Sequence, residues 1–179
     1  MTDQYRNLIE KYPELTLSLG DEPRKTPFFR PSFDQMYMAI ALIVGKRSTC
    51  LRGQIGAVIC KDTRIISIGY NGAPSGMAQC NQEGCIIDTQ RGGCIRTIHA
   101  EQNAIAYACR IGIPMERATL YVTLSPCIDC AKLIIASGIK RVVYYEAYRK
   151  GYAIDFLIQS GVQVEHLPFG IQEMISQFP

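Results

Sequence analysis

The chain has 179 residues, which fits one domain with a substantial buried core. Apolar residues make up 47% and charged residues 20%, an ordinary composition for a soluble protein, and a net charge of +3 is too small to indicate nucleic acid as a partner. The longest apolar run, residues 36–44, is about half a membrane span, and residues 1–10 lack the apolar core of a secretion signal, so we expect a cytoplasmic protein without a membrane partner.

The N-terminal segment, residues 1–30, predicts an arm outside the main domain. It combines Pro13, Pro23 and Pro27 with scattered charges, and only residues 5–11 are typical of a short helix. The arm is either irregular or an ordered strap that lies on the surface or on a partner subunit. We expect one domain at residues 31–170 and a short tail at 171–179.

The next part of the chain predicts a helix and a hairpin. Apolar residues recur at helical spacing over residues 33–46, with Ser32 as the cap. Two β-branched runs, residues 54–60 and 64–69, are separated by three polar residues, which predicts an antiparallel hairpin. A glycine-punctuated loop, residues 72–98, follows. A loop of that length inside a compact domain needs a reason, which a metal would supply.

The second half alternates strands and helices. We expect strands at residues 118–124, 141–145 and 162–167, and helices at residues 99–110, 126–137 and 152–159. For the helix at 126–137, Ser125 stands at the capping position, Pro126 at the first helical position and Gly138 just past the end. A hairpin followed by this alternation predicts an α/β fold with a mixed five-stranded sheet and helices on both faces.

Two short motifs indicate a zinc site, one with His99 and Glu101 and the other with Cys127 and Cys130. One imidazole and two thiolates hold zinc by three side chains and leave the fourth position for water, which is typical of a catalytic zinc. Zinc lowers the pKa of its water to about 7, and Glu101, which is not needed as a ligand, could move the proton. The alternatives are a satisfied core histidine, and two cysteines that form half of a structural zinc site.

Helix geometry restricts how these four residues meet. Cys127 and Cys130 are three apart, so on one helix both thiolates face one side of its first turn. His99 and Glu101 are two apart and do not face each other, so they share a site only if the metal lies beyond the helix start, near its axis. Two helix N-termini converging on one ion would also favour its thiolates.

His-Ala-Glu at 99–101 followed by Pro-Cys-x-x-Cys at 126–130 is the pattern of zinc nucleobase deaminases, and the chain resembles the cytidine/deoxycytidylate deaminase superfamily. Further stretches that make it most similar to deoxycytidylate (dCMP) deaminases are residues 46–50, 54–58, 69–76 and 131–134. The resemblance implies a three-layer α-β-α cytidine deaminase-like fold and hydrolysis of dCMP to dUMP and ammonia. Hydroxide would attack C4 of cytosine, while Glu101 would carry protons to N3 and to the leaving amino group.

The same resemblance implies the substrate contacts. Backbone N–H groups near Ala100 and Cys127 would bind the pyrimidine carbonyl, with Ser125 beside them, and Asn71 would bind the sugar hydroxyl. Asn71 could instead only form a turn with the glycine that follows it, and Tyr148 either lines the substrate pocket or packs in the core. The candidates for the phosphate, each of which could equally face solvent, are Arg96, Arg110, Arg149 and Lys150.

A second zinc site is predicted from the remaining cysteines. Eight cysteines in a cytoplasmic chain indicate metal binding or buried thiols more than disulfides. Cys60 and Cys109 continue a strand and a helix, and we expect both in the core. Four thiolates suit a closed, structural zinc, and the four that remain are Cys50, Cys80, Cys85 and Cys94. In the resembled dCMP deaminases this zinc is held by Cys and His; buried thiols or a disulfide are the alternative.

The family resemblance also implies regulation. Family members are activated by dCTP and inhibited by dTTP, usually with magnesium, in homo-oligomers that are often hexamers. The glycine-rich stretch at 69–76 could take part in such a nucleotide site or be only a turn. The candidate residues for the effector are Gly69, Tyr70, Gly72, Pro74 and Arg110.

Two rival functions use the same motifs. A tRNA or other nucleic-acid adenosine deaminase shares the zinc chemistry, but it would need a basic groove with exposed aromatic residues, which the modest charge argues against. A zinc-stabilised interaction module without catalysis would not need an open metal position or a free Glu101.

Overall fold

The computed structural model describes residues 10–14, 30–90, 92–148 and 151–168. Most of the predicted arm lies outside these residues, and so do most of the short helix predicted at 5–11 and the whole predicted tail at 171–179. The division into arm, domain and tail therefore stays a prediction. Within the described ranges, no helix is both long enough and apolar enough to cross a membrane.

A mixed five-stranded sheet with the strand order β2-β1-β5-β6-β7 forms the centre of the fold. Its strands are β1 (Gly56–Lys61), β2 (Arg64–Tyr70), β5 (Thr119–Leu124), β6 (Arg141–Glu146) and β7 (Gln163–His166). β1 runs antiparallel to both β2 and β5, whereas β5, β6 and β7 are parallel to one another. The predicted hairpin and mixed sheet are confirmed, with strand ends that differ from the prediction by one or two residues.

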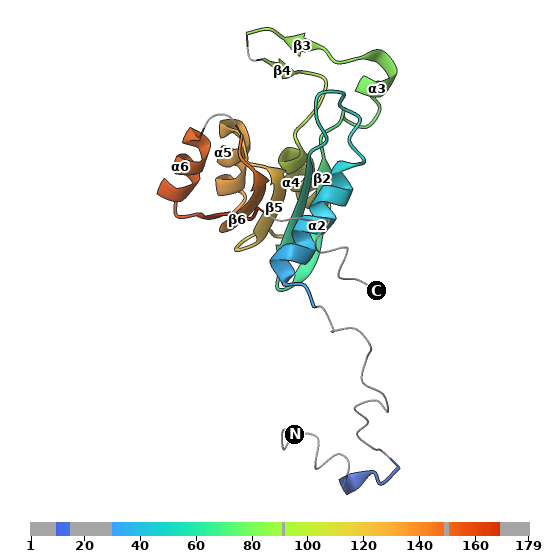
Figure 1. Ribbon diagram of the computed structural model, residues 1–179, viewed down its shortest axis with the longest axis vertical. Helices are drawn as coiled ribbons and strands as arrows, with labels where there is room; N and C mark the ends of the chain where they lie inside the picture. The colour runs from blue at the N-terminus through green and yellow to red at the C-terminus, as the bar shows by residue number, and fades with distance from the viewer. Residues whose placement is uncertain (1–9, 15–29, 91, 149–150, 169–179) are drawn as a thin grey trace.

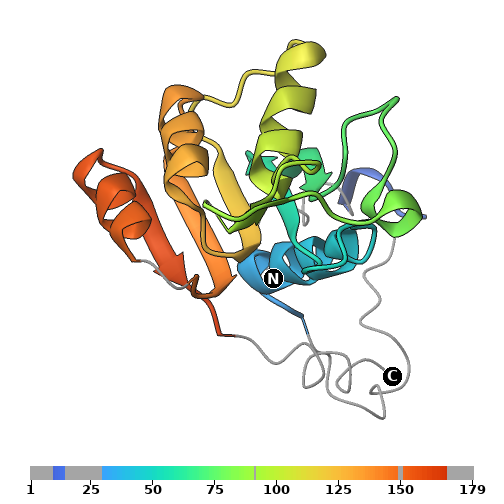
Figure 2. The same cartoon turned by 90° about the horizontal axis from the view of Figure 1, so that it is seen from above.

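The sheet separates two hydrophobic cores, because neighbouring residues of a strand point to opposite faces. Ala57 and Ile59 of β1 pack in the core on the side of α4 (Ala100–Arg110), α5 (Ile128–Ala136) and α6 (Tyr152–Gln159). Val58 and Cys60 pack in the core on the side of α2 (Phe33–Gly45). The view from above shows the resulting three layers, with α2 on one face and α4, α5 and α6 on the opposite face (Figure 2).

The first turn of α4 is held tightly against β2. A Cβ at Gly69 would overlap the backbone of Ala100 and Ala104, so glycine lets the helix approach this closely. Asn103 Nδ2 donates to the carbonyl oxygen of Tyr70 at 2.9 Å, and Ser67 Oγ donates to that of Ala104 at 2.7 Å. These contacts fix the N-terminal end of α4 relative to the sheet.

The helix predicted at 126–137 begins later than expected. Cys127 is the N-cap of α5, with extended backbone angles (φ −77°, ψ 172°), so Pro126 precedes the helix and Ser125 does not cap it. Ser125 Oγ instead accepts a hydrogen bond from the backbone N–H of Tyr148 at 2.7 Å. The prediction was wrong because proline is equally compatible with the extended backbone before an N-cap and with the first helical turn.

The segment predicted as one loop, residues 72–98, contains short regular elements. These are α3 (Cys80–Glu83) and the paired strands β3 (Ile87–Asp88) and β4 (Gly93–Cys94). Figure 1 shows them projecting from one end of the sheet. A bridge between Gly72 and Ile98 closes the base of the segment.

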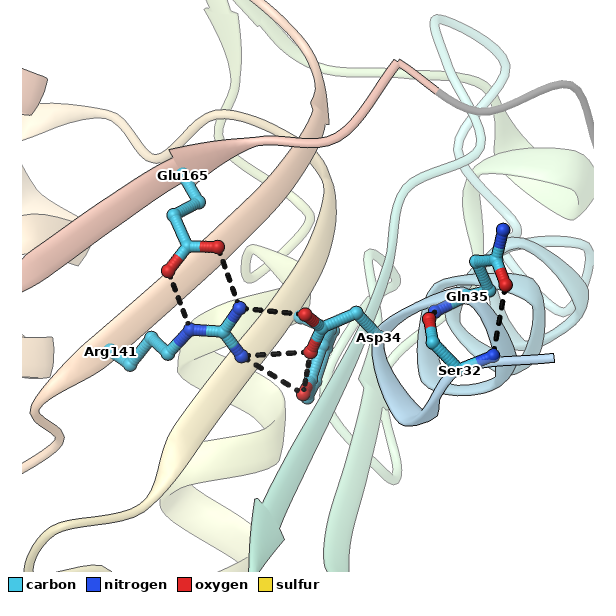
Figure 3. A network of polar contacts seen from close by, with 6 residues as sticks. Ser32, Asp34, Gln35, Arg141 and Glu165 are labelled. Carbon is cyan, nitrogen blue, oxygen red and sulfur yellow. Dashed lines mark hydrogen bonds and ion pairs between the residues drawn. The ribbon is translucent and has the colours of Figure 1, made fainter.

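An ion-pair network joins the start of α2 to the edge of the sheet (Figure 3). Ser32 and Gln35 form a reciprocal capping box that begins α2, which confirms the predicted cap. Next to it, two guanidinium nitrogens of Arg141 each donate to one carboxylate oxygen of Asp34 at 2.8 Å. The same guanidinium donates to Glu165 of β7 at 2.9 and 2.7 Å. These hydrogen bonds lower the pKa values of Asp34 and Glu165.

We expect Arg141→Gln to lower the free energy of unfolding at pH 7 by about 1 kcal/mol, because the network is partly exposed and screened by solvent. A carboxyl with a lowered pKa stabilises the folded state above its unfolded pKa and loses this effect as pH falls through its folded pKa. The ordinary values are 3.8 for Asp34 and 4.5 for Glu165, so the difference between wild type and variant should shrink below about pH 4. Urea unfolding of wild type and Arg141→Gln at pH 7 and pH 3 measures this difference in the free energy of unfolding. An equal difference at both pH values would show that Arg141 does not stabilise the ionised carboxylates of Asp34 and Glu165.

Candidate active site

The three predicted zinc ligands meet where α4 and α5 begin. His99 and Cys127 are the N-caps of these helices, and Cys130 lies in the first turn of α5. His99 Nδ1 lies 3.5 Å from Cys127 Sγ and 3.4 Å from Cys130 Sγ. Zn–N and Zn–S bonds of normal length at tetrahedral angles would place these atoms about 3.6 Å apart. The donor set and its spacing therefore fit a zinc ion.

The two helix starts explain how the ligands converge. Because His99 has extended backbone angles (φ −74°, ψ 158°), it precedes the helix that carries Glu101 and does not share its surface. The side-chain oxygen of Gln102 accepts a hydrogen bond from the His99 backbone N–H at 2.9 Å and holds this conformation. The two cysteines were predicted on one helix face. In the structure Cys127 lies just before α5, and the sulfurs of Cys127 and Cys130 approach His99 at the N-terminal end of that helix.

Hydrogen bonds among Cys127, Cys130 and His99 shift the pKa values of all three side chains. A hydrogen bond from the Cys130 thiol, together with one to His99, outweighs the effect of burial and lowers the pKa of Cys127 to about 4. The same hydrogen bond raises the pKa of Cys130, and a hydrogen bond with Cys127 raises that of His99. The cluster therefore forms a thiolate readily, and thiolate is the form of cysteine that binds a metal.

Glu101 is a buried carboxyl beside these ligands. It lies in the first turn of α4 and is 4% exposed. Burial raises the pKa of Glu101, while hydrogen bonds from its own backbone N–H and from the Cys130 thiol act in the opposite direction. A carboxyl with a raised pKa next to a metal site is suited to take up and release a proton.

An open cavity of about 230 Å³ includes His99, Glu101 and Cys127 in its lining. The residues predicted to contact the substrate, Asn71, Ala100, Ser125 and Tyr148, all line the same cavity. The lining residues that the sequence did not indicate include Arg52, Ile55, Thr97 and Leu124. Arg52 had one signal, since it follows Cys50 by two residues in a segment already expected near a metal.

The side chain of Asn71 also holds a wall of this cavity. Its Oδ1 accepts a hydrogen bond from the Ile55 backbone N–H at 2.8 Å, and its Nδ2 donates to the Gly53 carbonyl at 2.9 Å. An amide has two N–H donors and two lone pairs, so one of each is left for a ligand. Asn71 therefore does more than form a turn with Gly72.

The four cysteines predicted for a second metal also gather. The sulfurs of Cys50, Cys80 and Cys85 lie within 4.8 Å of one another, and Cys94 Sγ lies 3.8 Å from Cys80 Sγ. Two sulfurs bound to one tetrahedral zinc are about 3.8 Å apart. None of the eight cysteines forms a disulfide.

The environment of this second cluster favours one thiolate. Burial opposes ionisation of Cys94, but hydrogen bonds from the Arg96 backbone, the Cys80 thiol and the Ile86 backbone outweigh it and lower the pKa of Cys94 to about 7. Burial raises the pKa of Cys80 to about 12.

The two cysteines predicted in the core differ. Cys60 is buried between β1 and α2, which confirms the prediction. Cys109 is exposed, so its prediction was wrong. The buried residues of α4 include Ala104, Ile105 and Ala108, and position 109 falls outside that stripe.

A second cavity, of about 620 Å³, includes three of the five residues predicted for an effector nucleotide: Tyr70, Pro74 and Arg110. Gly72 does not line it, but the Gly72 carbonyl accepts a hydrogen bond from Ile98, which does. Gly69 is not part of it either, because Gly69 packs beneath α4.

Of the residues predicted for the phosphate, Arg149 and Lys150 lie outside the described residues. Arg96 Nη1 donates to the Ala78 carbonyl at 3.1 Å and lies 3.5 Å from a carboxylate oxygen of Glu83. Arg110 lines the larger cavity and not the one with the candidate metal ligands.

The chain is similar to a deaminase family and to several known proteins along most of its length. Residues 31–146 match the family model of the cytidine and deoxycytidylate deaminase zinc-binding region. ComE operon protein 2 of Bacillus subtilis is 44% identical over 147 residues, which cover 82% of this chain and 76% of that protein. The deoxycytidylate deaminase of Enterobacteria phage T2 is 38% identical over 179 residues, covering 79% of this chain and 95% of the phage protein. A crystal structure of dCMP deaminase from the cyanophage S-TIM5 in complex with dCMP and dUMP has a TM-score of 0.68 at 34% identity, covering 78% of this chain and 100% of that one.

Because the structure has two sulfur-containing clusters, we expect about two zinc ions per purified chain. Elemental analysis after dialysis measures this zinc content. Cys130→Ser and Cys80→Ser should each lower the content by about one ion, because each removes one thiolate ligand from a different cluster. Cys109→Ser is the matched control, since its exposed thiol belongs to neither cluster. A wild-type content of one ion would contradict the second site.

Proposed function

Because the chain belongs to the cytidine and deoxycytidylate deaminase family, we propose that it converts dCMP to dUMP and ammonia by zinc-dependent hydrolysis. The observation that carries this proposal is the gathering of His99, Cys127 and Cys130 beside the buried Glu101. Three protein ligands leave one position of a tetrahedral zinc open, whereas a structural zinc is closed by four. A purely structural module would have no use for a buried carboxyl at that place.

Three residues of the cavity, Glu101, Ala100 and Asn71, have roles in this proposed chemistry. Bound zinc would supply a Lewis acid that lowers the pKa of a water molecule to about 7. Glu101 accepts one proton of the attacking water and passes it to N3 of the cytosine ring. It then takes the remaining proton from the new C4 hydroxyl and gives it to the amino group, so that the C4–N bond breaks, ammonia leaves and C4 becomes a carbonyl. The backbone N–H of Ala100, at the first position of α4, has no partner inside the helix and would bind the pyrimidine carbonyl. Asn71 has one amide N–H and one lone pair for the sugar hydroxyl.

We propose a structural zinc for the second cluster, held by Cys50, Cys80, Cys85 and Cys94. Three sulfurs within 4.8 Å of one another and a fourth, of Cys94, 3.8 Å from that of Cys80 support a closed site. Cys50 lies after α2 and the other three lie in the segment 72–98, so one ion would anchor that segment to the body of the domain. Cys50 and Cys94 also line the active-site cavity, which would connect the second metal to the shape of that cavity.

For the larger cavity, our proposal is an effector nucleotide, with dCTP as activator and dTTP as inhibitor, accompanied by magnesium in a homo-oligomer. Its volume of about 620 Å³, against about 230 Å³ for the active-site cavity, gives room for a triphosphate. Arg47 and Arg110 supply cations for phosphate groups, and Tyr70 and Tyr107 supply aromatic rings for a base.

The partition between the two cavities supports coupling between them. In three segments, adjacent residues line opposite cavities: Thr49 and Cys50, Tyr70 and Asn71, Ile98 and His99. Thr49 Oγ1 donates to Gln79 Oε1 at 2.7 Å, and the Gly72–Ile98 bridge joins the other two segments. A nucleotide that displaces one side of this partition would also displace His99 or Asn71 on the other side.

Glu101→Gln should retain zinc, because it leaves all three ligands in place, and should lower kcat for dCMP about 10³-fold, since general acid–base catalysis contributes this order of magnitude. Steady-state dUMP formation together with the zinc content of the same sample checks both parts. A fully zinc-loaded variant with more than about a tenth of wild-type turnover would exclude the proton-transfer role.

The substrate is tested by ammonia release from dCMP, CMP, cytidine and an adenosine-containing RNA. We expect the highest kcat/KM for dCMP, and a further change when dCTP or dTTP is added with magnesium. Preference for the RNA would favour the adenosine deaminase alternative, and release from none of the four would favour a module without catalysis.

A further inference from the structure

Arg96 is a largely buried arginine that lines neither of the two cavities. Its side chain is 12% exposed, and the one described carboxylate within ion-pair distance is that of Glu83, at 3.5 Å and 63% exposed. Arg96 Nε is also the only buried side-chain nitrogen or oxygen, in the part of the chain that the structure describes, without a hydrogen-bond partner. Because buried charges are normally paired and hydrogen-bonded, we expect a further anion beside this guanidinium.

The contacts of Arg96 join two parts of the second cysteine cluster. Its backbone N–H donates a hydrogen bond to Cys94 Sγ. Its Nη1 donates to the carbonyl oxygen of Ala78 at 3.1 Å and to the Glu83 carboxylate at 3.5 Å. Ala78 precedes Cys80 by two residues, and Glu83 ends α3, the helix that Cys80 begins. Arg96 therefore links the two segments whose sulfurs, of Cys80 and Cys94, lie 3.8 Å apart.

A metal bound to this cluster would supply the missing anion. One zinc ion and four thiolates together carry a net charge of about −2, since the ligands are deprotonated when the metal binds. Residues around a metal site tune it by donating hydrogen bonds to the ligands and by supplying charge. Because Arg96 is largely shielded from solvent, its attraction to this negative charge is screened much less than that of a surface arginine.

We propose that Arg96 is a positioning residue of the second metal site, which compensates the charge of the four thiolates and holds the start of α3 against β4. The inference rests on the structural zinc proposed above for Cys50, Cys80, Cys85 and Cys94. Since Cys50 and Cys94 also line the active-site cavity, Arg96 keeps that part of the cavity wall in place without touching the cavity itself.

The test compares Arg96→Gln and Arg96→Lys with wild type in competition for zinc with a chromophoric chelator. We expect two steps of zinc release, one absent from Cys80→Ser and the other from Cys130→Ser. In Arg96→Gln the affinity of the step that Cys80→Ser lacks should fall about 10- to 100-fold, the usual effect of losing a partner of a metal ligand, and the other step should not change. Arg96→Lys should recover part of the loss, since it keeps the charge without the planar fork.

Two further variants are matched controls. Glu83→Gln removes the exposed carboxylate and leaves the cation, so it should change the zinc affinity less than about threefold. Arg64→Gln, at the end of β2 away from the segment 72–98, removes an exposed arginine and should have no effect. An equal loss in Glu83→Gln and Arg96→Gln, or in Arg96→Lys and Arg96→Gln, would mean that Arg96 only shapes α3 and would overturn the inference.

Cobalt(II) in place of zinc gives a readout that a purely structural role would not move. A cation beside a thiolate lowers the energy of the sulfur electrons. In Arg96→Gln, the part of the sulfur-to-cobalt charge-transfer band that Cys80→Ser removes should therefore shift to longer wavelength, and in Arg96→Lys it should shift less. An unchanged band or an unchanged zinc affinity would overturn the inference.

The same measurements separate this inference from the proposals on which it builds. A wild type with one zinc ion would contradict the structural zinc and the role of Arg96 together. Two zinc ions with the expected effects in Arg96→Gln, but no turnover of dCMP, would contradict the proposed deamination and support the role of Arg96.

Discussion

The start of two helices at one point is the constraint on which the site depends. His99 and Cys127 occupy the N-caps of α4 and α5, so their backbones are extended and their side chains lie beyond the first turns. Glu101 and Cys130 then reach the same place from inside those turns. Unpaired N–H groups and the positive ends of both helix dipoles point there, which favours thiolates and a developing oxyanion. Gly69 sets the close approach of α4 to β2 and thereby the position of half the site.

A second constraint concerns the segment 72–98, which projects beyond the sheet (Figure 1) and whose described residues belong to neither hydrophobic core. Sulfur ligands can replace hydrophobic packing as the source of its order. Because Cys50 and Cys94 belong to this cluster and also line the active-site cavity, the order of the segment and the shape of the cavity depend on each other. The contact between Arg52 and Gly92 crosses the same junction. The candidate metal ligands and Glu101 therefore lie at the starts of helices packed on the sheet, whereas part of the cavity wall belongs to the projecting segment.

Most of the fold could be predicted because it follows from local periodicity. Runs with alternating or helical spacing marked the strands and helices, and their order along the chain implied a mixed sheet covered on both sides. The start of α5 could not be predicted from residues 125–127, since a proline is compatible both with the first helical position and with the extended residue before the N-cap. The exposure of Cys109 was missed as well, because one residue of rotation around α4 decides whether a thiol is buried.

The sequence by itself determined the chemistry: an imidazole, two sulfurs and a spare carboxyl at a characteristic spacing, and four more cysteines around a long insertion. Only the tertiary structure decided which of the described arginines and lysines lines the active-site cavity. Arg52 has no motif of its own, and it lines the cavity together with Gly92, a residue 40 positions later whose carbonyl oxygen accepts a hydrogen bond from it. The spacing of residues reveals which atoms can react, whereas contacts across tens of residues depend on packing that no local pattern encodes.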